Sequence, residues 1–302
     1  MSNILKSSSH QVIDDLYNNL NDSISIFQNF SRNIPLYHYT TTSGLLGILS
    51  SDCLWSSNAY FLNDLSEYNY AFNIIKEQIE KSKLRFVDSF NTILDNAFKY
   101  IQLQIDYYVI SFSECKDLLS QWRAYSNCGN GYSLGFNLHD LFNTFKPNLD
   151  CNYAFIQKVT YNTTEQKVII DNVLNRAFVY FNNTPNIDEN DFIFTLSLFL
   201  SGCMLWFKHD AFHEENEWRI IFIPNYDTDN QYMEFREGSD RLIPYFKLYR
   251  YLDNNRSKLP VSSIHYGPTT NFNLTDRALN LLLKRYKYNS VSIHGSSNPL
   301  CR

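Results

Sequence analysis

The chain has 302 residues, with 26 Lys or Arg and 31 Asp or Glu, so its formal net charge at pH 7 is −5. Hydrophobic residues at 44% and charged residues at 19% exclude an intrinsically disordered chain, and the length is enough to bury a substantial core. The mild acidity argues against a protein that coats nucleic acid electrostatically, although it does not exclude a local basic groove.

Neither a membrane segment nor a disulfide framework is expected. The longest nearly apolar run, residues 192–207, contains 16 residues, fewer than the roughly 20 that a membrane-crossing helix needs. The N-terminus is polar and lacks the apolar stretch of a signal peptide. The 6 cysteines form no CxxC pair and are expected to be free thiols. We therefore expect a cytoplasmic protein with no membrane partner.

The first third of the chain is predicted to be mainly helical. Apolar residues at helical spacing predict an N-terminal helix within residues 1–33. Short β-rich runs predict strands at 36–39 and 53–55, which flank a short helix over 45–49. A long helical pattern then covers residues 67–104.

The rest of the chain is richer in strands. The strands are separated irregularly and strict βαβ alternation is absent, which favours an α+β fold with mixed or antiparallel sheets over a doubly wound fold. We expect residues 34–302 to form a single domain, because no convincing internal boundary is visible. The predicted helices are 163–181, 192–207 and 272–286, and the predicted strands are 107–112, 132–136, 153–161, 218–223, 232–235, 242–249, 261–266 and 290–294.

The segment FKHDAFHEENEWR, residues 207–219, concentrates side chains that could carry chemistry. His209 and His213 are four residues apart, the spacing that places two zinc ligands on one face of a helix. The HExxH order fails, because Glu217 stands where the second His should be. A zinc-dependent hydrolase is therefore kept only as an alternative to a solvated turn that leads into a strand.

Glu217 stands at the entrance of the strand predicted at 218–223, beside Trp218 and Arg219. A carboxylate next to large apolar groups at a strand edge has an environment that suits electrostatic catalysis. The alternative is a rim carboxylate paired with Arg219 or a neighbouring Lys.

Two other polar positions lie on predicted strands. His38 stands between two tyrosines, where it either contacts a ligand or makes a structural hydrogen bond. Ser111 and Ser113 share one face of a strand, because strand side chains alternate. The two hydroxyls either bind a ligand or merely end the strand.

Short motifs follow one another in order along the chain: LYHYT (36–40), GLLGIL (44–49), LWSSNAYFLND with Glu67 (54–67), SFSE (111–114), LSQWRAYS (119–126), GYSLGF (131–136), FHEENEWRIIF (212–222), YGP (266–268) and Pro299–Arg302. This series resembles the bacterial family catalogued as domain of unknown function 2971, from about residue 34 onward. The terminal motif departs from the family's usual Pro-aromatic-Arg ending, which leaves its role open.

A strand that bears His38, a polar turn and a helix of the pattern Gly-Leu-x-x-Ile-Leu also resemble the opening of the ADP-ribosyltransferase superfamily. This looser resemblance implies split mixed and antiparallel β-sheets with helices packed around them. It also implies NAD as the substrate and no metal. The superfamily places a His or Arg on the first strand, a Tyr or Ser-x-Ser on a central strand and a Glu on a later strand. The matching positions here are His38, then Ser111 with Ser113 (or Tyr132), and Glu217, with Glu214 and Glu215 as alternatives to Glu217.

The resemblance implies a NAD-dependent ADP-ribosyltransferase, an enzyme of the glycosyltransferase class. Glu217 would stabilise the oxocarbenium-like transition state, and His38 would fix the adenosine-side ribose. Ser111 would help to hold the geometry of the strand and the Glu. Further contacts to NAD are expected, by side-chain type, from Tyr39, Thr40, Ser113, Tyr132, Arg123 and Arg219.

The implied acceptor of ADP-ribose is a macromolecule, either nucleic acid or protein. The implied role is that of a toxin or an antiviral defence effector, with an antitoxin or chaperone as a further partner. The competing reading is a non-catalytic module on the same fold that binds a nucleotide or nucleic acid. The enzyme predicts that His38, Ser111 and Glu217 converge on one cleft, whereas the binding module leaves the cleft shallow or the Glu turned away.

Overall fold

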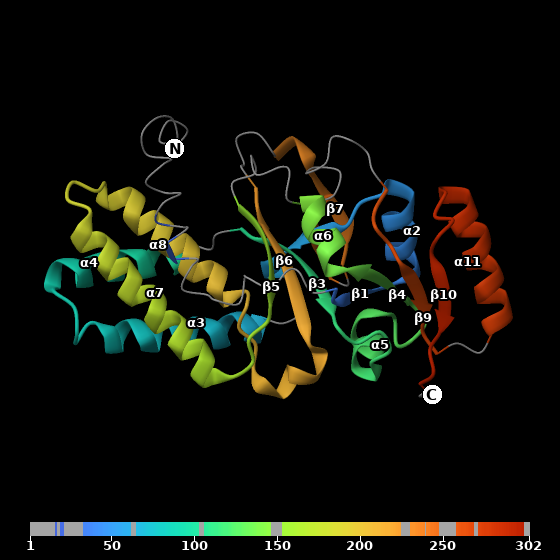
Figure 1. The fold of residues 1–302 in the computed structure, drawn as a ribbon, viewed down its shortest axis with the longest axis horizontal. Helices are drawn as coiled ribbons and strands as arrows, with labels where there is room; N and C mark the ends of the chain where they lie inside the picture. The colour runs from blue at the N-terminus through green and yellow to red at the C-terminus, as the bar shows by residue number, and fades with distance from the viewer. Residues whose placement is uncertain are drawn as a thin grey trace. The chain divides into compact units, whose positions relative to one another are not determined.

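The computed structural model describes residues 16, 19–20, 33–61, 65–102, 106–145, 153–224, 230–238, 240–247, 258–268 and 271–298 (Figure 1). Most of the predicted N-terminal helix, residues 62–64 of the LWSSNAYFLND motif and the terminal motif Pro299–Arg302 lie outside the described residues.

The chain divides into two compact units, whereas the sequence predicted a single domain over 34–302. Unit 1 comprises Met1–Gln28, Leu62–Asp106 and Val159–His213, and unit 2 comprises Asn29–Phe61, Tyr107–Lys158 and Glu214–Arg302. Each unit is therefore assembled from three stretches that are separated in sequence. Because the stretches of the two units alternate along the chain, no single linker separates the units in the sequence.

Unit 1 contains the helices α3 (Leu65–Ser82), α4 (Asp88–Gln102), α7 (Thr163–Asn183) and α8 (Glu189–Met204). The helical pattern predicted over 67–104 is divided between α3 and α4, because the chain turns between them. At this turn the Arg85 guanidinium donates to Ser82 Oγ at 2.7 Å and pairs with Asp171 of α7 at 2.8 Å. These contacts hold the chain out of a continuous helix.

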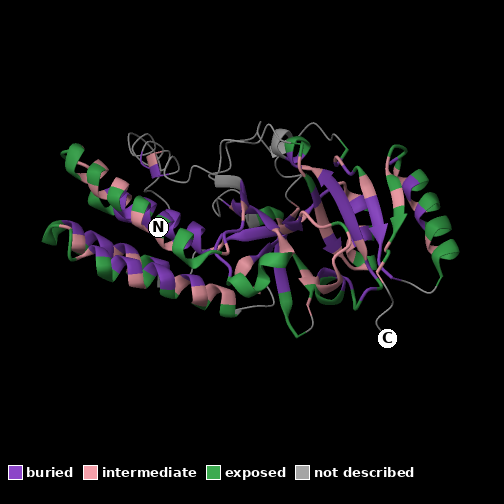
Figure 2. Cartoon of the chain, turned by 60° about the horizontal axis from the view of Figure 1, so that its bottom comes forward, coloured by how far each residue is buried: buried purple, intermediate pink, exposed green. Residues whose placement is uncertain are grey.

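The α8 helix confirms that the long apolar run is a buried helix. Asp188 caps its N-terminus by accepting the backbone N–H groups of Asn190 and Asp191. Nearly every side chain from Phe192 to Met204 is buried, and in Figure 2 buried residues follow one side of the unit 1 helices. In the part of the chain that the structure describes, no helix combines the length and apolar character that a membrane crossing requires.

The described strands of unit 2 form one ten-stranded sheet in the order β10-β9-β4-β1-β3-β2-β8-β7, with β6 paired to β3 and β5 paired to β6. The pairings are antiparallel except for β9 and β10, which are parallel, so the mixed sheet expected from the sequence is confirmed. The strands are β1 (Pro35–Thr40), β2 (Trp55–Asn58), β3 (Tyr108–Ser113), β4 (Tyr132–Asn137), β5 (Tyr153–Lys158), β6 (Glu217–Ile223), β7 (Met233–Glu237), β8 (Leu242–Lys247), β9 (Ser263–Tyr266) and β10 (Ser292–Gly295).

The sheet narrows between β1 and β3. The two strands share a single registered pair, Tyr37 with Ser113. By contrast, β1 is registered with β4 over six residues, and β3 is registered with β6 over six residues. The sheet therefore has two parts, which we call its limbs. One limb contains β1, β4, β9 and β10, and the other contains β2, β3 and β5 to β8. The registered pair Tyr37–Ser113 connects them.

Helices of unit 2 pack on the sheet. They are α2 (Thr42–Ser51), α5 (Leu119–Tyr125), α6 (Leu138–Phe145) and α11 (Phe272–Tyr286). The described 3₁₀ turns are η2 (Ala59–Phe61), η3 (Asp210–Glu215) and η4 (Asn230–Tyr232). The sequence predicted α11 with its observed bounds, but it did not predict α5 or α6. Both are only two turns long, and short helices depend on tertiary packing for their stability.

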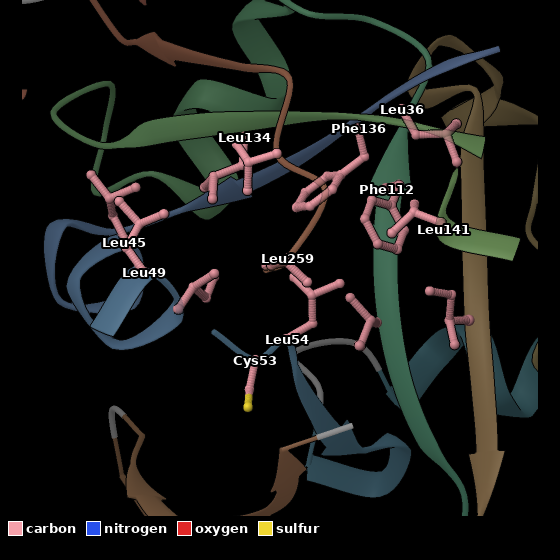
Figure 3. Packing of buried hydrophobic residues seen from close by; sticks show 14 of the residues in the cluster. Leu36, Leu45, Leu49, Cys53, Leu54, Phe112, Leu134, Phe136, Leu141 and Leu259 are labelled. Carbon is pink, nitrogen blue, oxygen red and sulfur yellow. The ribbon is translucent and has the colours of Figure 1, made fainter. Parts of the chain in front are cut away.

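The hydrophobic core of unit 2 lies on one face of the sheet. Leu36, Phe112, Leu134 and Phe136 of neighbouring strands belong to one buried cluster that also includes Leu45 and Leu49 of α2 (Figure 3). Because strand side chains alternate, the residues between them, which include Tyr37, Ser113 and Ser133, belong to the opposite face. We call this second surface the polar face. It carries several of the candidate site residues.

Candidate functional site

Glu217, Ser113 and Tyr37 form a row across three strands of the polar face. Glu217 of β6 is registered opposite Ser113 of β3, and Ser113 is registered opposite Tyr37 of β1. Registered residues of antiparallel strands point to the same face. The row runs through the single connection between the two limbs of the sheet.

The Glu217 carboxylate makes a buried, two-pronged ion pair with Arg219. Arg219 Nε lies 2.7 Å from Glu217 Oε1, and Arg219 Nη2 lies 2.9 Å from Glu217 Oε2. The two residues are only 5% and 7% exposed. They are two positions apart on one strand, so they share a face, and the fork of the guanidinium fixes the plane of the carboxylate.

Ser111 lies beside this pair. It is registered opposite Arg219, just as Ser113 is registered opposite Glu217. The Ser-x-Ser stretch of β3 therefore faces the Glu-x-Arg stretch of β6 directly.

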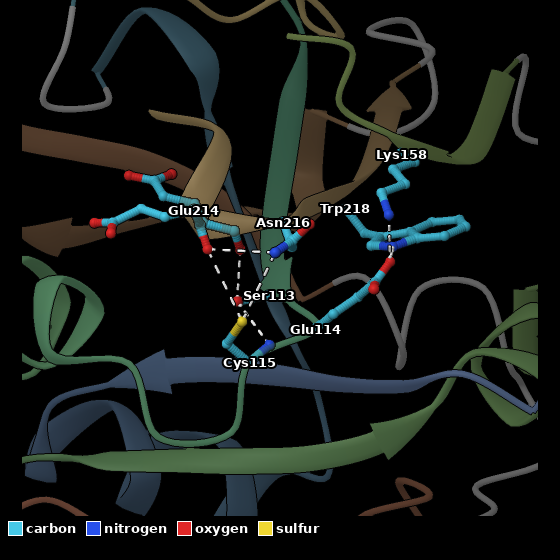
Figure 4. Close-up of polar contacts among 8 residues, drawn as sticks. Ser113, Glu114, Cys115, Lys158, Glu214, Asn216 and Trp218 are labelled. Atoms are coloured by element: carbon cyan, nitrogen blue, oxygen red, sulfur yellow. Dashed lines mark hydrogen bonds and ion pairs between the residues drawn. The ribbon is translucent and has the colours of Figure 1, made fainter. Parts of the chain in front are cut away.

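The loops that flank this row are tied together by Ser113 (Figure 4). Ser113 Oγ donates to the Glu215 carbonyl at 2.6 Å and accepts the Cys115 N–H at 3.0 Å. Asn216 Nδ2 donates to the Glu214 carbonyl at 3.4 Å, and Asn216 has a φ of 41°, in the left-handed region. Glu214 and Glu215 thus enter this network through main-chain carbonyls. Of the three candidate carboxylates, Glu217 alone lies on a strand.

The Glu114 carboxylate also belongs to the network next to the row (Figure 4). Glu114 Oε1 accepts Trp218 Nε1 at 2.8 Å and Lys158 Nζ at 2.7 Å. These contacts join the ends of β3, β5 and β6. Glu114 therefore holds the strand that begins with Glu217, and the sequence reasoning did not identify it.

The structure does not place His38 with Glu217. His38 is registered opposite Leu134, and its ring lies 5.7 Å from the Phe112 ring, so it is on the core side of the sheet. Its Nδ1 is 2.9 Å from the Ser111 carbonyl oxygen, in the gap where β1 and β3 separate. Burial lowers the pKa of His38, the hydrogen bond to Ser111 opposes this, and the charge of Arg236 lowers the pKa further. The expected convergence of His38, Ser111 and Glu217 on one cleft is therefore not seen for the His38 side chain.

The other predicted contacts to NAD are divided between the two faces. Tyr39 lies on the polar face, where its hydroxyl donates to the Cys115 carbonyl at 2.7 Å and accepts the Leu118 N–H at 3.0 Å. Thr40 is registered opposite Tyr132, and both alternate to the same side as His38. Arg123 is exposed on α5. Only Tyr39 of this set shares a face with Ser113 and Arg219.

Asp117 organises a site that the sequence reasoning missed. Its carboxylate accepts five hydrogen bonds at 2.6–2.9 Å: from Trp122 Nε1, Ser296 Oγ, Ser297 N, Ser297 Oγ and Asn298 Nδ2. Although burial raises the pKa of Asp117, the hydrogen bonds from Ser296, Trp122 and Ser297 outweigh it and lower the pKa to about 2. The sequence offers no sign of this, because the partners are up to 181 residues away.

The zinc alternative finds no support in the geometry. Among the residues that the structure describes, no group of three or more His, Cys, Asp or Glu side chains could hold a metal ion. His213 lies in the 3₁₀ turn η3 and His209 lies just before it, so the helical spacing assumed for a shared metal is absent. His209 Nδ1 accepts the Ala211 N–H at 3.2 Å, and His213 Nδ1 lies 2.9 Å from the Asp210 carbonyl oxygen.

Comparison with known proteins supports one of the two resemblances. A family model described as "Protein of unknown function (DUF2971)" matches residues 121–220. The matched region includes β4, β5 and the Glu217–Arg219 pair, and it supports the resemblance to this family. No curated protein and no solved structure matches the chain.

Proposed function

We propose that the chain is an ADP-ribosyltransferase-like enzyme that cleaves the nicotinamide–ribose bond of NAD and transfers ADP-ribose to a macromolecule. The observation that carries the proposal is the register of Ser113 with Glu217 and of Ser111 with Arg219. It joins the Ser-x-Ser strand and the Glu strand that the superfamily resemblance implies.

The proposed reaction uses Glu217 electrostatically. The bond between ribose C1′ and the nicotinamide nitrogen breaks, and nicotinamide leaves with the bonding electron pair. A cation with oxocarbenium character then develops on the ribose, and a carboxylate fixed nearby stabilises it. The acceptor's oxygen or nitrogen forms the new bond to C1′ and loses its proton. The acceptor is proposed to be nucleic acid or protein.

Arg219 keeps the carboxylate in one orientation, which is what electrostatic stabilisation requires. A group that is already oriented does not have to reorganise when charge develops in the transition state. Ser113 supports the same geometry by anchoring the Glu215 carbonyl, two residues before Glu217. The role as a toxin or defence effector with an antitoxin or chaperone partner rests on the family resemblance.

One observation favours the competing function, a non-catalytic module that binds a nucleotide or nucleic acid. His38 and Glu217 belong to opposite faces of the sheet, and both carboxylate oxygens of Glu217 contact Arg219. The paired carboxylate fits the turned-away Glu that the binding module predicts, whereas the separation of His38 from Glu217 fits neither function.

The experiment is incubation of the purified chain with labelled NAD, alone and with DNA, RNA or cell lysate, with released nicotinamide and transferred label as readouts. Glu217→Gln is expected to lower turnover about 100-fold or more, because one preorganised electrostatic group is lost. Glu214→Gln and Glu215→Gln are the matched controls and are expected to keep wild-type turnover. Unchanged turnover in Glu217→Gln contradicts the site assignment.

Folding must be measured alongside, because Arg219 loses its buried ion pair in Glu217→Gln. Removing one partner of such a pair typically costs about 3–5 kcal/mol. The double variant Glu217→Gln with Arg219→Gln removes both charges and separates the loss of turnover from the loss of stability. A folded wild type that binds NAD without turning it over identifies the binding module.

A further inference from the structure

Three aromatic rings gather on the polar face next to the Glu217 row. Tyr37 of β1 meets His265 of β9 edge to face, with ring centroids 5.5 Å apart and planes at 81°. His265 in turn stacks on His294 of β10, with centroids 4.9 Å apart and planes at 22°. We call Tyr37, His265 and His294 the ring cluster.

The register connects the ring cluster to the candidate site. Tyr37 is both a member of the cluster and the registered partner of Ser113, which is itself opposite Glu217. Neighbouring strands are about 4.8 Å apart, so the backbones of Tyr37 and Glu217 lie about 10 Å from each other across the face. One dinucleotide can span this separation.

Gly135 keeps the space between Tyr37 and Ser263 open. It stands between them in the register. A Cβ at this position would lie 2.2 Å from Ser263 Oγ and 3.2 Å from Tyr37 Cε1. The glycine therefore allows the Tyr37 ring to lie over β4 toward His265.

The three rings differ in exposure: one is buried and the other two are reached by solvent to different extents. His265 is only 7% exposed, Tyr37 is half-buried and His294 is exposed. Each imidazole has a hydroxyl within reach, with Ser263 Oγ 3.2 Å from His265 Nε2 and Ser292 Oγ 2.9 Å from His294 Nε2. Burial, the charge of His294 and the charge of Lys116 lower the pKa of His265 to about 4, against the opposing charge of Asp117. His265 is therefore an uncharged ring at neutral pH.

We propose that the ring cluster is the binding platform for the adenine ring of a nucleotide, with the base stacked on His294 and the Tyr37 ring inclined to it at the side. Aromatic and imidazole rings bind nucleobases by stacking. Lys116, exposed on the loop after β3, supplies a cation for the phosphate. The proposal rests on the proposed function insofar as it identifies this nucleotide as the adenosine half of NAD.

The test measures AMP binding by titration calorimetry and NAD turnover in parallel. His294→Ala is expected to weaken AMP binding about 10-fold, whereas His294→Phe keeps a flat ring and is expected to retain most of it. His139→Ala, at an exposed histidine of α6, is the matched control and is expected to bind AMP like the wild type. Thermal melting checks that each variant is folded.

The outcomes separate the two proposals. Equal AMP affinity in wild type and His294→Ala, or no AMP binding at all, overturns the platform. If His294→Ala turns over NAD with an unchanged KM for NAD, the platform is also overturned, but the proposed enzymatic function is supported. Weaker AMP binding in His294→Ala, in a protein that never turns over NAD, supports the platform and contradicts the enzyme.

Discussion

At the scale of single residues, Asp117 shows how one carboxylate joins distant segments. It bonds Trp122 on α5 and the segment 296–298, which follows β10. Trp122 also meets the Tyr39 ring, with centroids 4.8 Å apart. Asp117 therefore holds α5 and the end of β10 beside the strand that carries Tyr37 and Tyr39.

Asp117→Asn is expected to change how stability depends on pH. The folded pKa of Asp117 is lowered from 3.8 to about 2. The ionised form therefore contributes stability above pH 4, and this contribution is lost as the pH falls toward 2. We expect Asp117→Asn to lower the free energy of unfolding by about 1–2 kcal/mol at pH 7, allowing for solvent screening, and by less at pH 3.

Urea unfolding at pH 7, 4 and 3 measures this difference. Asp140→Asn, at an exposed carboxylate of α6, is the control and is expected to change stability little at any of these pH values. An Asp117→Asn effect of the same size at pH 3 and pH 7 contradicts the linkage to the charge of Asp117.

At the scale of elements, α2 packs on the sheet through a position that only glycine fits. Thr41 caps the helix by accepting the Gly44 N–H at 3.2 Å. A Cβ on Gly47 would lie 2.2 Å from Trp55 Cζ2, and the Trp55 ring is itself packed on Tyr245 with centroids 4.9 Å apart. The close approach of α2 to β2 therefore depends on the missing side chain.

Gly47→Ala is expected to destabilise unit 2 by about 1–3 kcal/mol, the usual cost of overpacking. Alanine favours the helix over glycine by only about 1 kcal/mol, so the clash with Trp55 outweighs the gain in helix propensity. Ser50→Ala, at an exposed position of the same helix, is the control and is expected to be nearly neutral. Chemical denaturation measures both, and a Gly47→Ala variant more stable than the wild type would show that the Trp55 ring moves aside freely.

At the scale of the whole molecule, two compact units are each built from three separated stretches of chain. Unit 1 contains a buried ion pair in which Lys208, 2% exposed, lies 2.8 Å from Glu67. The Lys208 ammonium also lies 5.1 Å from the centre of the Phe212 ring. Unit 2 is instead stabilised by its sheet and by the hydrophobic core around α2.

We expect calorimetry to resolve two unfolding transitions, one for each unit. Glu67→Gln removes the carboxylate partner of a buried ammonium and is expected to lower the transition of unit 1, with a cost of about 3 kcal/mol. Gly47→Ala is expected to lower the other transition. A single transition that both variants shift equally would show that the two units unfold as one cooperative system.

Local sequence patterns were enough to predict much of the secondary structure. Apolar spacing placed α11 at 272–286, the run at 192–207 predicted a buried helix, and strand patterns located most of β1 to β10 within a few residues. These signals are local, because they depend on side chains a few positions apart in one segment. For the same reason they identified Glu217 as the entrance of a strand.

Which side chains share a surface depends on the tertiary structure and could not be predicted from local patterns. A shift of one residue in strand register exchanges the two faces of a strand, and the register depends on contacts between segments far apart in the chain. The register separated His38 from Glu217, aligned Glu217 with Ser113 and Tyr37, and brought His294 to His265. The same reason applies to Asp117 and Ser296. They form a hydrogen bond although 179 residues of chain separate them, so no local pattern could predict their contact.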